Sequence, residues 1–378
     1  MFPKSRKAAA AAVGAVLCLV LAACGGNAGG SDKSGSLSGA EQQAIADAKA
    51  TYDEYRKPRP AEAVPELPSP APTGKNFSVI TCNFPVCKST SDGAVAAAEK
   101  LGWKVTVLQD DSTPQSYVSV MNQVAANPPD ALAYVPVLPD SSVQAQLDKL
   151  KAAGTKIVEI APLGEAVGAG GAVQGVVLGS KDLAMSGRLM GAAVVADAGA
   201  PAKAVFVWDP SFRDGWSPMK KAFDDAISSA GGTPDVLEAA LAGIGKTVPA
   251  QIVSYLQAHP DTPYVALGMV NYNAGLNEAL QAAGLLGKVK VISRAANSAT
   301  LGAVKSGKEW ASVAIELAAC GYRAVDSLVR LMMGLPLGDR ANVAGWQQIF
   351  VKDTVPPTGA QPEPPDYAQA YHRAWHVG

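Results

Sequence analysis

The sequence predicts an α/β fold of two lobes, each a doubly wound parallel sheet. With 378 residues, the chain exceeds what one compact core usually holds, so two lobes are expected. Short apolar runs alternate with stretches of helical composition from about residue 76 to residue 351. The first unit, residues 77–108, reads as strand, helix and strand joined by short loops. Such a crossover requires a parallel sheet with helices on its faces.

This first unit also predicts where a ligand binds. Residues 77–82 (FSVITC) are rich in β-branched side chains and are typical of a buried strand, and residues 103–108 read as the next one. Four residues that favour a helix N-cap follow the loop: Ser89, Thr90, Ser91 and Asp92. The loop at 83–87 follows the carboxyl end of a strand, where parallel sheets bind ligands. We therefore expect Asn83 and Phe84 to contact the ligand.

The remaining elements follow in regular alternation. Strands are expected at residues 131–136, 156–160, 173–177, 204–208, 236–241, 264–267, 289–292, 310–315 and 347–351. Helices are expected at residues 114–126, 141–153, 182–196, 215–229, 248–259, 273–283, 299–305 and 318–333. A further helix at 40–56 precedes a Pro-rich spacer at 58–72, which should be extended. This order supports two doubly wound lobes.

The N-terminus has the features of an export signal. Lys4, Arg6 and Lys7 precede a short apolar run, and small residues then lead to Cys24. The run is short for a membrane span, so a signal peptide over residues 1–23 is expected. The segment LAAC resembles the lipobox of bacterial lipoproteins, which implies lipid attachment to Cys24; the alternative is an ordinary signal with an incidental cysteine. Loss of the three cations would change the formal net charge from −1 to −4.

Cysteine usage agrees with export. Cys82 and Cys87 are five residues apart across the strand-to-helix loop, and outside the cytoplasm a disulfide between them is expected. Two buried thiols are the alternative. A metal site is a weaker alternative, because no partner ligands lie nearby in the sequence. Cys320 should pack within a helix as a small apolar residue.

Composition argues against several functions. A formal net charge of −1 without a basic cluster in the body makes nucleic acid an unsuitable partner. Three histidines, His259, His372 and His376, are too few and too scattered for a histidine metal site or a catalytic triad. The sequence also lacks a G-x-S-x-G motif and a complete phosphate-binding loop. We therefore expect no enzyme activity, no metal and no cofactor.

Several segments, in order and at matching spacing over about residues 76–351, resemble type I periplasmic binding proteins of the ribose-binding kind. They include EKLGW at 99–103, AAGTKIVEI at 152–160, NAGLNEALQAAGL at 273–285 and CGYRAVDSLVRLMMG at 320–334. The resemblance implies two lobes joined by a three-crossing hinge, with a small molecule closed between them. It also implies delivery to an ABC permease. The N-terminal helix, the Pro-rich spacer and the paired cysteines resemble lipid-anchored import receptors of Gram-positive bacteria.

The resemblance divides the chain into lobes and places the crossings near residues 178–180, 314–316 and 338–343. The expected domains are the signal at 1–23, the lipid-anchored tether, helix and spacer at 24–75, the N-terminal lobe at 76–178 plus 315–343, the C-terminal lobe at 179–314 plus 344–355, and a tail at 356–378. The sequence leaves open whether that tail packs on the body. We expect a monomer anchored by lipid to the extracytoplasmic face of the cell membrane.

Candidate ligand-binding residues lie at strand ends on both sides of the expected cleft. In the N-terminal lobe they are Asn83, Phe84, Pro136 and Pro162; in the other lobe they are Asp209, Phe212, Asp214, Trp216, Asn271, Tyr272, Arg294 and Asn297; Glu316 follows the second crossing. The aromatic members would stack on a ring, and the polar ones would fix polar groups. Structural roles are the alternatives: a helix cap for Asp214, a core position for Trp216, a solvated charge for Arg294, and a turn for Asn271 and Tyr272.

The polar residues with which the sugar-binding relatives hold hydroxyl groups are largely replaced. Apolar or altered residues stand at those positions: Ala161 and Pro162, Met269 and Val270, Ala295 and Ala296, Ile315, and Asp214. Each sugar hydroxyl left unpaired on burial costs about 1–3 kcal/mol. The sequence therefore predicts a ligand less polar than a pentose, with an aromatic or alicyclic body. The alternative functions are a ligand sensor for a membrane signalling protein and, least favoured, an exported hydrolase.

Overall fold

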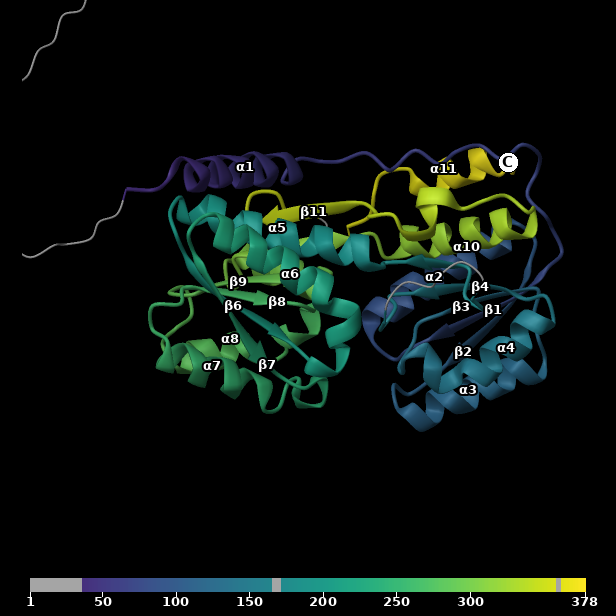
Figure 1. The fold of residues 1–378 in the computed structure, drawn as a ribbon, viewed down its shortest axis with the longest axis horizontal. Coiled ribbons are helices and arrows are strands. Elements are labelled where there is room, and N and C mark those ends of the chain that lie inside the picture. The colour runs from purple at the N-terminus through teal and green to yellow at the C-terminus, as the bar shows by residue number, and fades with distance from the viewer. Residues whose placement is uncertain (1–35, 165–170, 358–361) are drawn as a thin grey trace, which may run out of the picture. The chain divides into compact units, whose positions relative to one another are not determined.

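Two separate β-sheets organise the chain (Figure 1). The computed structural model describes residues 36–164, 171–357 and 362–378. The strand order is β2-β1-β3-β4-β5 in the first sheet and β11-β10-β9-β8-β6-β7 in the second. Within the described residues every pairing of these strands is parallel except that of β10 with β11. Both orders are doubly wound, so the predicted fold class is confirmed.

The elements have the following bounds. The strands are β1 Asn76–Thr81, β2 Lys104–Gln109, β3 Ala131–Tyr134, β4 Lys156–Ile160, β5 Gly175–Val177, β6 Lys203–Trp208, β7 Thr233–Glu238, β8 Tyr264–Leu267, β9 Lys290–Arg294, β10 Ala311–Ile315 and β11 Gln347–Val351. The α-helices are α1 Gly39–Tyr55, α2 Pro85–Lys100, α3 Pro114–Ala126, α4 Gln144–Ala152, α5 Ser180–Ala198, α6 Arg213–Ser229, α7 Val248–Ala258, α8 Leu276–Ala282, α9 Ser298–Ser306, α10 Ala318–Met332 and α11 Tyr367–Ala374. Short 3₁₀ turns are η1 Asp140–Val143, η2 Pro210–Phe212, η3 Leu241–Gly243, η4 Val270–Asn273 and η5 Gly338–Asn342.

The inner strands of each sheet are buried on both faces, as is usual for parallel sheets. Along β1, Phe77 and Val79 enter one apolar cluster, whereas Ile80 enters another on the opposite face. In β6, Phe206 and Val207 are divided between two clusters in the same way. Successive side chains of a strand point to opposite faces. The continuous apolar runs of the sequence are thus explained by helices on both sides.

The chain passes three times between the two sheets. After β5 it enters α5, which packs on α6 over the second sheet. After β10 it enters α10, which packs on α2 and β4 of the first sheet. After η5 it returns to β11 in the second sheet. Because Leu37–Gly378 form one compact unit, the lobe boundaries at residues 178, 314 and 343 remain a prediction.

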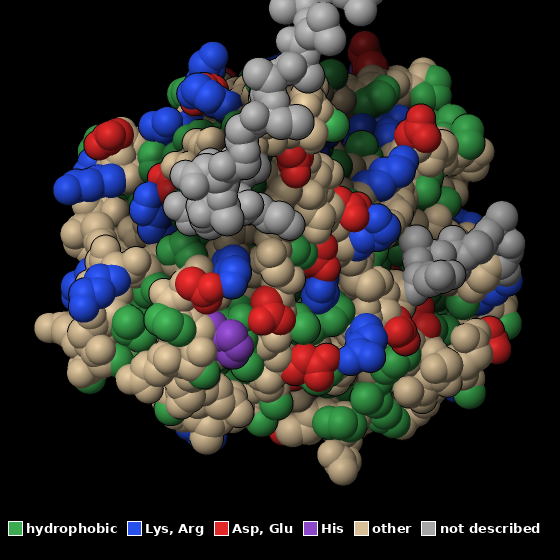
Figure 2. Space-filling view, turned by 60° about the vertical axis from the view of Figure 1, so that its left-hand side comes forward, with side chains coloured by type: hydrophobic (Ala, Val, Ile, Leu, Met, Phe, Trp, Pro, Cys, Tyr) green, Lys and Arg blue, Asp and Glu red, His purple; other side chains and the backbone are tan. Residues whose placement is uncertain are grey.

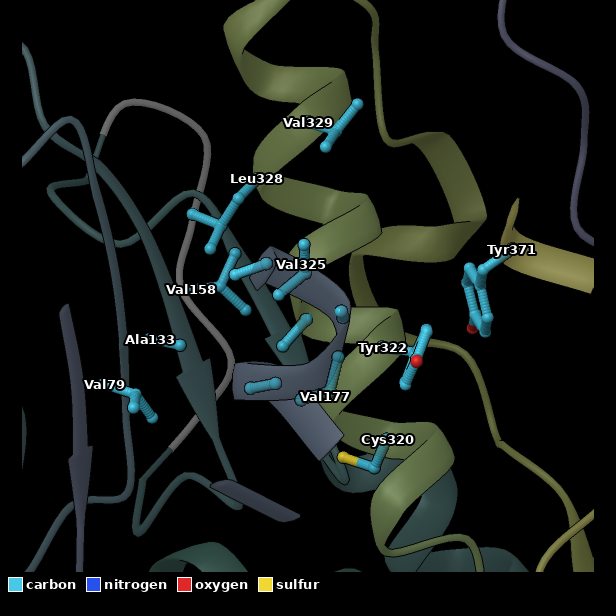
Figure 3. Packing of buried hydrophobic residues seen from close by; sticks show 14 of the residues in the cluster. Val79, Ala133, Val158, Val177, Cys320, Tyr322, Val325, Leu328, Val329 and Tyr371 are labelled. Atoms are coloured by element: carbon cyan, nitrogen blue, oxygen red, sulfur yellow. The ribbon is translucent and has the colours of Figure 1, made fainter. Parts of the chain in front are cut away.

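Helix α10 is the centre of the core of the first lobe (Figure 3). Val325 and Leu328 on this helix pack with Val158 of β4, and Cys320 is a fully buried free thiol. Gly321 brings α10 against α2, because a Cβ there would collide with the backbone of Thr90 and Ala94. The predicted role of Cys320 as a small apolar packing residue is confirmed.

The start of α2 differs from the prediction. The helix begins at Pro85, with Phe84 as N-cap, rather than after the group at 89–92. Proline suits the first turn of a helix, where its missing N–H would have no partner. The Ser89 and Thr90 hydroxyls instead donate to the carbonyls of Pro85 and Val86, one turn earlier. The predicted capping role of residues 89–92 is therefore wrong.

Two other boundaries move for local reasons. The helix expected at 273–283 is divided into η4 and α8, because Gly275 has φ +74° and interrupts the turn. The strand expected at 236–241 is β7, three residues earlier, where it pairs with β6 from Lys203 to Trp208.

The N-terminal segment packs on both lobes. Helix α1 begins with a capping box between Ser38 and Glu41. Its Ile45, Ala48, Tyr52 and Tyr55 pack against the cluster under α5. The extended spacer then reaches the first lobe, where Leu67 is 3% exposed and its N–H donates to the Ala374 carbonyl. The predicted helix at 40–56 is confirmed, and the spacer is part of the folded body.

The C-terminal tail also packs on the body. Helix α11 places Trp375, which is fully buried, against Tyr322 of α10 with ring centroids 5.9 Å apart. Figure 3 shows Tyr371 of the same helix beside Tyr322. The spacer covers this end from outside, since the N–H of Ala71 donates to the Trp375 carbonyl. The question that the sequence left open is answered for residues 362–378, which pack on the body through α11.

A chain that begins at residue 76 should be markedly less stable than one that begins at residue 37. The shorter chain loses the burial of Leu67, which is worth about 1.5–3 kcal/mol, and uncovers Trp375. We expect its midpoint of thermal unfolding to fall by several degrees. Circular dichroism melts of both chains measure this. Equal midpoints would show that the spacer only rests on the surface.

The surface carries charges of both signs. On the face shown in Figure 2, Lys and Arg side chains alternate with Asp and Glu rather than forming one large basic area. Nucleic-acid partners select extended basic surfaces, so this face offers no support for such a partner. In the part of the chain that the structure describes, no helix has the length and apolar character of a membrane span.

Candidate functional site

A cavity of about 180 Å³ lies between the two lobes at the carboxyl ends of the strands. Its described lining is mostly apolar and comes from both sheets. The lining residues are Cys82, Phe84, Val86, Cys87, Thr90, Ser112, Val135, Pro136, Val137, Ile160, Ala161, Leu163, Leu178, Leu183, Phe212, Trp216, Leu241, Met269, Arg294, Ala295, Ile315 and Leu317. In doubly wound sheets this edge is where ligands bind, so the cavity is the candidate ligand site.

The two lobes contribute equivalent loops to the cavity. Ala161 follows β4 and Ala295 follows β9, and each N–H donates to the neighbouring strand, at 2.8 Å to Val177 and 2.9 Å to Val313. Ala161, Ala295 and Leu178 all have φ between 54° and 66°, in the left-handed region. Backbone strain of this kind collects at binding sites, where it fixes the position of neighbouring groups.

Aromatic rings form much of the wall. Phe212 and Trp216 of the second lobe are stacked, with ring centroids 4.9 Å apart. Trp216 is 7% exposed, so it serves the core and the cavity wall together. Phe84 faces the cavity from the first lobe at the start of α2. Rings in this arrangement offer flat apolar faces to a ligand ring.

The two hydroxyl groups in the described wall already donate to other protein groups. Thr90 Oγ1 donates to the Val86 carbonyl at 3.2 Å, and Ser112 Oγ donates to Asn83 Oδ1 at 2.7 Å. A sugar ring needs many donors and acceptors at once. The described wall therefore offers few groups for sugar hydroxyls.

Arg294 is the one charged residue among the described lining residues. It ends β9, is 8% exposed, and donates from Nε to Ser186 Oγ at 2.9 Å. No carboxylate forms an ion pair with it among the described residues. Burial lowers the pKa of this guanidinium to about 10, and the charge of Asp182 opposes that shift. At neutral pH the group stays charged.

Five of the candidate residues named from the sequence line the cavity. They are Phe84, Pro136, Phe212, Trp216 and Arg294. The others do not line it: Asn83, Pro162, Asp209, Asp214, Asn271, Tyr272, Asn297 and Glu316. The expectation that Arg294 could be a solvated charge is wrong, because the side chain is buried.

Three of the residues outside the cavity hold local structure. Asp209 caps η2 by accepting from the Ser211 N–H at 2.8 Å, and its second oxygen accepts from the Leu241 N–H at 2.7 Å. Asn297 caps α9 by accepting from the Thr300 N–H at 2.9 Å. Tyr272 is fully buried, and its hydroxyl donates to a backbone carbonyl at 2.7 Å.

The remaining polar candidates also lie outside the wall. Asp214 is exposed in the first turn of α6 and does not cap it, because the N-cap is Phe212 and makes no side-chain cap bond. The Asn83 side-chain amide donates from Nδ2 to the Asp111 carbonyl and accepts at Oδ1 from the Ser112 hydroxyl. The side-chain oxygen of Asn271 is buried and has no partner in the described part of the chain.

Pro162 marks the place where the lobes touch. A Cβ on Gly215 of α6 would lie only 2.7 Å from the Pro162 carbonyl oxygen and 2.9 Å from the Leu163 Cα. Leu163 rather than Pro162 faces the cavity. The contact encloses one side of the site.

Glu316 belongs to an ion network at the hinge. Arg323 Nε lies 3.0 Å from Glu316 Oε1, and its Nη2 lies 3.1 Å from Asp182 Oδ2. All three side chains are almost fully buried. Burial raises the pKa of Glu316 to about 7, although Arg323 acts in the opposite direction. Its neighbours Ile315 and Leu317 reach the cavity instead.

The apolar wall residues were missed as individual positions. Leu163, Leu183 and Leu241 lie in loops or first turns, where a single sequence does not distinguish a cavity wall from core. For Leu163 the available signal was its position shortly after strand β4.

Cys82 and Cys87 are bonded to each other in the structure, with Cα atoms 5.5 Å apart, and both line the cavity. The bond joins the end of β1 to the first turn of α2. Within the described ranges, no group of three or more His, Cys, Asp or Glu side chains is arranged to hold a metal ion. Cys24 and the signal at 1–23 lie outside the described residues.

Comparison with known proteins supports the reading of the fold. A family model described as "Periplasmic binding protein domain" matches residues 77–336. Among solved structures, the chain is similar to an ABC transporter solute-binding protein from Agrobacterium vitis bound with α-D-tagatopyranose, with 20% identity and a TM-score of 0.65 over 76% of this chain and 99% of that one. It is also similar to AraP, an arabinose-binding protein from Geobacillus stearothermophilus, with 19% identity and a TM-score of 0.63 over 75% and 98% of the two chains. No curated protein sequence matches significantly.

Proposed function

The chain belongs to the periplasmic binding protein family, and from this premise we propose that it captures a small molecule with an apolar ring and delivers it to an ABC importer. Members of this family are solute-binding proteins, so the chain is a binding protein and not an enzyme. One observation carries the choice of ligand. The described wall of the interlobe cavity is aromatic and aliphatic, with one cation and two hydroxyls that already donate elsewhere.

The size of the cavity fits this ligand class. An apolar cavity of about 150 Å³ is enough to hold benzene, and this one measures about 180 Å³. The stacked pair of Phe212 and Trp216 provides a flat surface beside it. We propose a ligand with one aromatic or alicyclic ring rather than a free pentose or hexose.

Delivery would be from the membrane surface. We propose that residues 1–23 are removed and that Cys24 carries lipid, which would keep a monomeric receptor close to its permease. Export would also place the Cys82–Cys87 pair in an oxidising compartment, where the bond persists. Globomycin treatment of cells tests the anchor, because blocking the lipoprotein signal peptidase should leave a longer precursor in the membrane. Unchanged processing would exclude it.

The ligand class is tested by thermal shift on the chain from residue 24 onward with Cys24→Ser, which includes the whole unit Leu37–Gly378. A ligand present at about 100 times its Kd adds about 2.7 kcal/mol to the free energy of unfolding. We expect ring compounds to raise the unfolding midpoint and free sugars to leave it unchanged. Trp216→Ala should abolish the shift, whereas the half-buried Trp310, which is not among the lining residues of the cavity, can serve as a control through Trp310→Phe.

A rise in the unfolding midpoint with sugars alone would contradict the proposed ring ligand. It would leave only the general role of a solute-binding protein. A shift with rings that survives Trp216→Ala would place binding outside this cavity.

A further inference from the structure

Arg294 is a buried cation at the wall of the interlobe cavity, and the described residues give it no counter-charge. It is 8% exposed, and the described wall that it shares is mostly apolar, with Leu183, Met269 and Ala295 among its members. Isolated charges in apolar surroundings are costly, so buried arginines are normally paired with carboxylates. The described part of the chain provides no such pair for this one.

Asp182, the carboxylate whose charge acts on Arg294, is occupied by other partners. Asp182 lies on α5, the helix that also carries Ser186, but its Oδ2 is paired with Arg323 at 3.1 Å. Its Oδ1 accepts from the Gly345 N–H at 2.7 Å. Asp182 therefore serves the hinge and does not neutralise Arg294 by contact.

One hydrogen bond fixes the guanidinium and leaves the rest of it free. Nε donates to Ser186 Oγ at 2.9 Å, and Ser186 Oγ in turn donates to Gln347 Oε1 at 2.8 Å. The terminal nitrogens make no hydrogen bond to any described residue. Arginine presents its N–H groups as a planar fork that matches a carboxylate. The hydrogen bonds from Arg294 to Ser186 and from Ser186 to Gln347 thus fix the guanidinium in place. Its terminal N–H groups are left available to bind an anion.

We propose that the ligand is a monocarboxylate on an apolar ring, with its carboxylate bound by Arg294 and its ring lying between Phe84 and the Phe212–Trp216 stack. This inference rests on the proposed function and specifies its ligand. The described wall supplies one cation, which suits one carboxylate. The remaining described wall has few free polar groups, which suits a body without further hydroxyls.

The test compares acids with neutral compounds of the same shape. Benzoate and cyclohexanecarboxylate are paired with benzamide and cyclohexanecarboxamide, and binding to the chain from residue 24 onward with Cys24→Ser is measured by isothermal titration calorimetry at pH 7. Loss of one partner of a buried charge pair commonly costs about 100-fold in affinity or more. We expect the acids to bind about 100-fold more tightly than the amides.

The variant Arg294→Met should remove this preference, so that acid and amide bind equally. Arg188→Met is the matched control, since Arg188 is exposed on the same helix as Ser186 and should leave the preference intact. Because no described carboxylate pairs with the buried Arg294, its replacement by methionine should not lower the unfolding midpoint of the free protein. That melt shows that a lost preference is not caused by misfolding.

The outcomes separate this inference from the proposed function. Equal binding of acids and amides by the unsubstituted protein would overturn the carboxylate and keep the apolar ligand. Binding of sugars without ring compounds would overturn both. If neither benzoate nor cyclohexanecarboxylate binds, the inference of a one-ring monocarboxylate is overturned. If Arg294→Met still binds the acids more tightly than the amides, another group binds the carboxylate and the role of Arg294 is overturned.

Discussion

Arg323→Met is expected to lower the free energy of unfolding by about 3–5 kcal/mol at pH 8, because it leaves two buried carboxylates without their cation. Arg323 is 2% exposed and pairs with Asp182 at 3.1 Å and Glu316 at 3.0 Å. It also donates to the Val343 carbonyl at 2.9 Å. These partners lie on the three chain crossings, so one side chain joins all of them. Urea unfolding of the variant and the parent measures the loss.

The loss should depend on pH. Burial raises the pKa of Glu316 to about 7 with Arg323 present, and without the arginine this pKa should rise further. A carboxyl group with a raised pKa in the folded state contributes stability at low pH that is lost as the pH rises through that pKa. The free energy of unfolding of Arg323→Met should therefore be close to that of the parent at pH 5 and clearly lower than that of the parent at pH 8.

A charge-free hinge provides the control for this prediction. Asp182→Asn and Glu316→Gln, added to Arg323→Met, remove all three charges and should recover most of the lost stability. A loss of about 0.5 kcal/mol or less for Arg323→Met alone, which is the range of ordinary surface substitutions, would contradict the role assigned to the network.

The sequence predicted the strands and most helices because burial on both faces of a parallel sheet produces continuous apolar runs. The start of α2 was misplaced because Ser, Thr and Asp favour caps wherever they occur, while Pro85 sets the actual first turn. The burial of Leu67 in a Pro-rich spacer could not be predicted, since it depends on α11 arriving from the far end of the chain.

Within the site, aromatic candidates were located better than polar ones. Asp209 and Asn297 follow strands and precede helical turns, and this position suits a ligand contact and an N-cap equally. Only the hydrogen bonds of the folded chain distinguish the two roles. Trp216 and Phe212 were placed correctly beside the cavity because the helix that follows β6 must begin at the carboxyl edge of the sheet.

Glu309→Gln is expected to raise stability at alkaline pH. Glu309 is 3% exposed, and its Oε2 accepts from Asn273 Nδ2 at 3.0 Å. Burial raises the pKa of this carboxyl to about 8, although hydrogen bonds from Asn273 and Asn277 favour the charged form. Since the folded-state pKa lies above the unfolded value of 4.5, the stability it contributes is complete below pH 4.5 and is lost as the pH rises toward 8.

Glutamine keeps the shape of the neutral acid and does not ionise, so the variant should retain at pH 8 the stability that the parent loses. One pKa unit corresponds to about 1.4 kcal/mol, and the difference should reach a few kcal/mol, on the order of the shift. Urea unfolding between pH 5 and pH 8 measures both curves, with Glu278→Gln, an exposed acid on α8, as the matched control. Other buried acids such as Glu159 give both proteins a common slope, because burial raises the pKa of that group too. Only the difference between the curves reports on Glu309, and parallel curves would mean that its carboxyl is ionised in the folded protein at neutral pH.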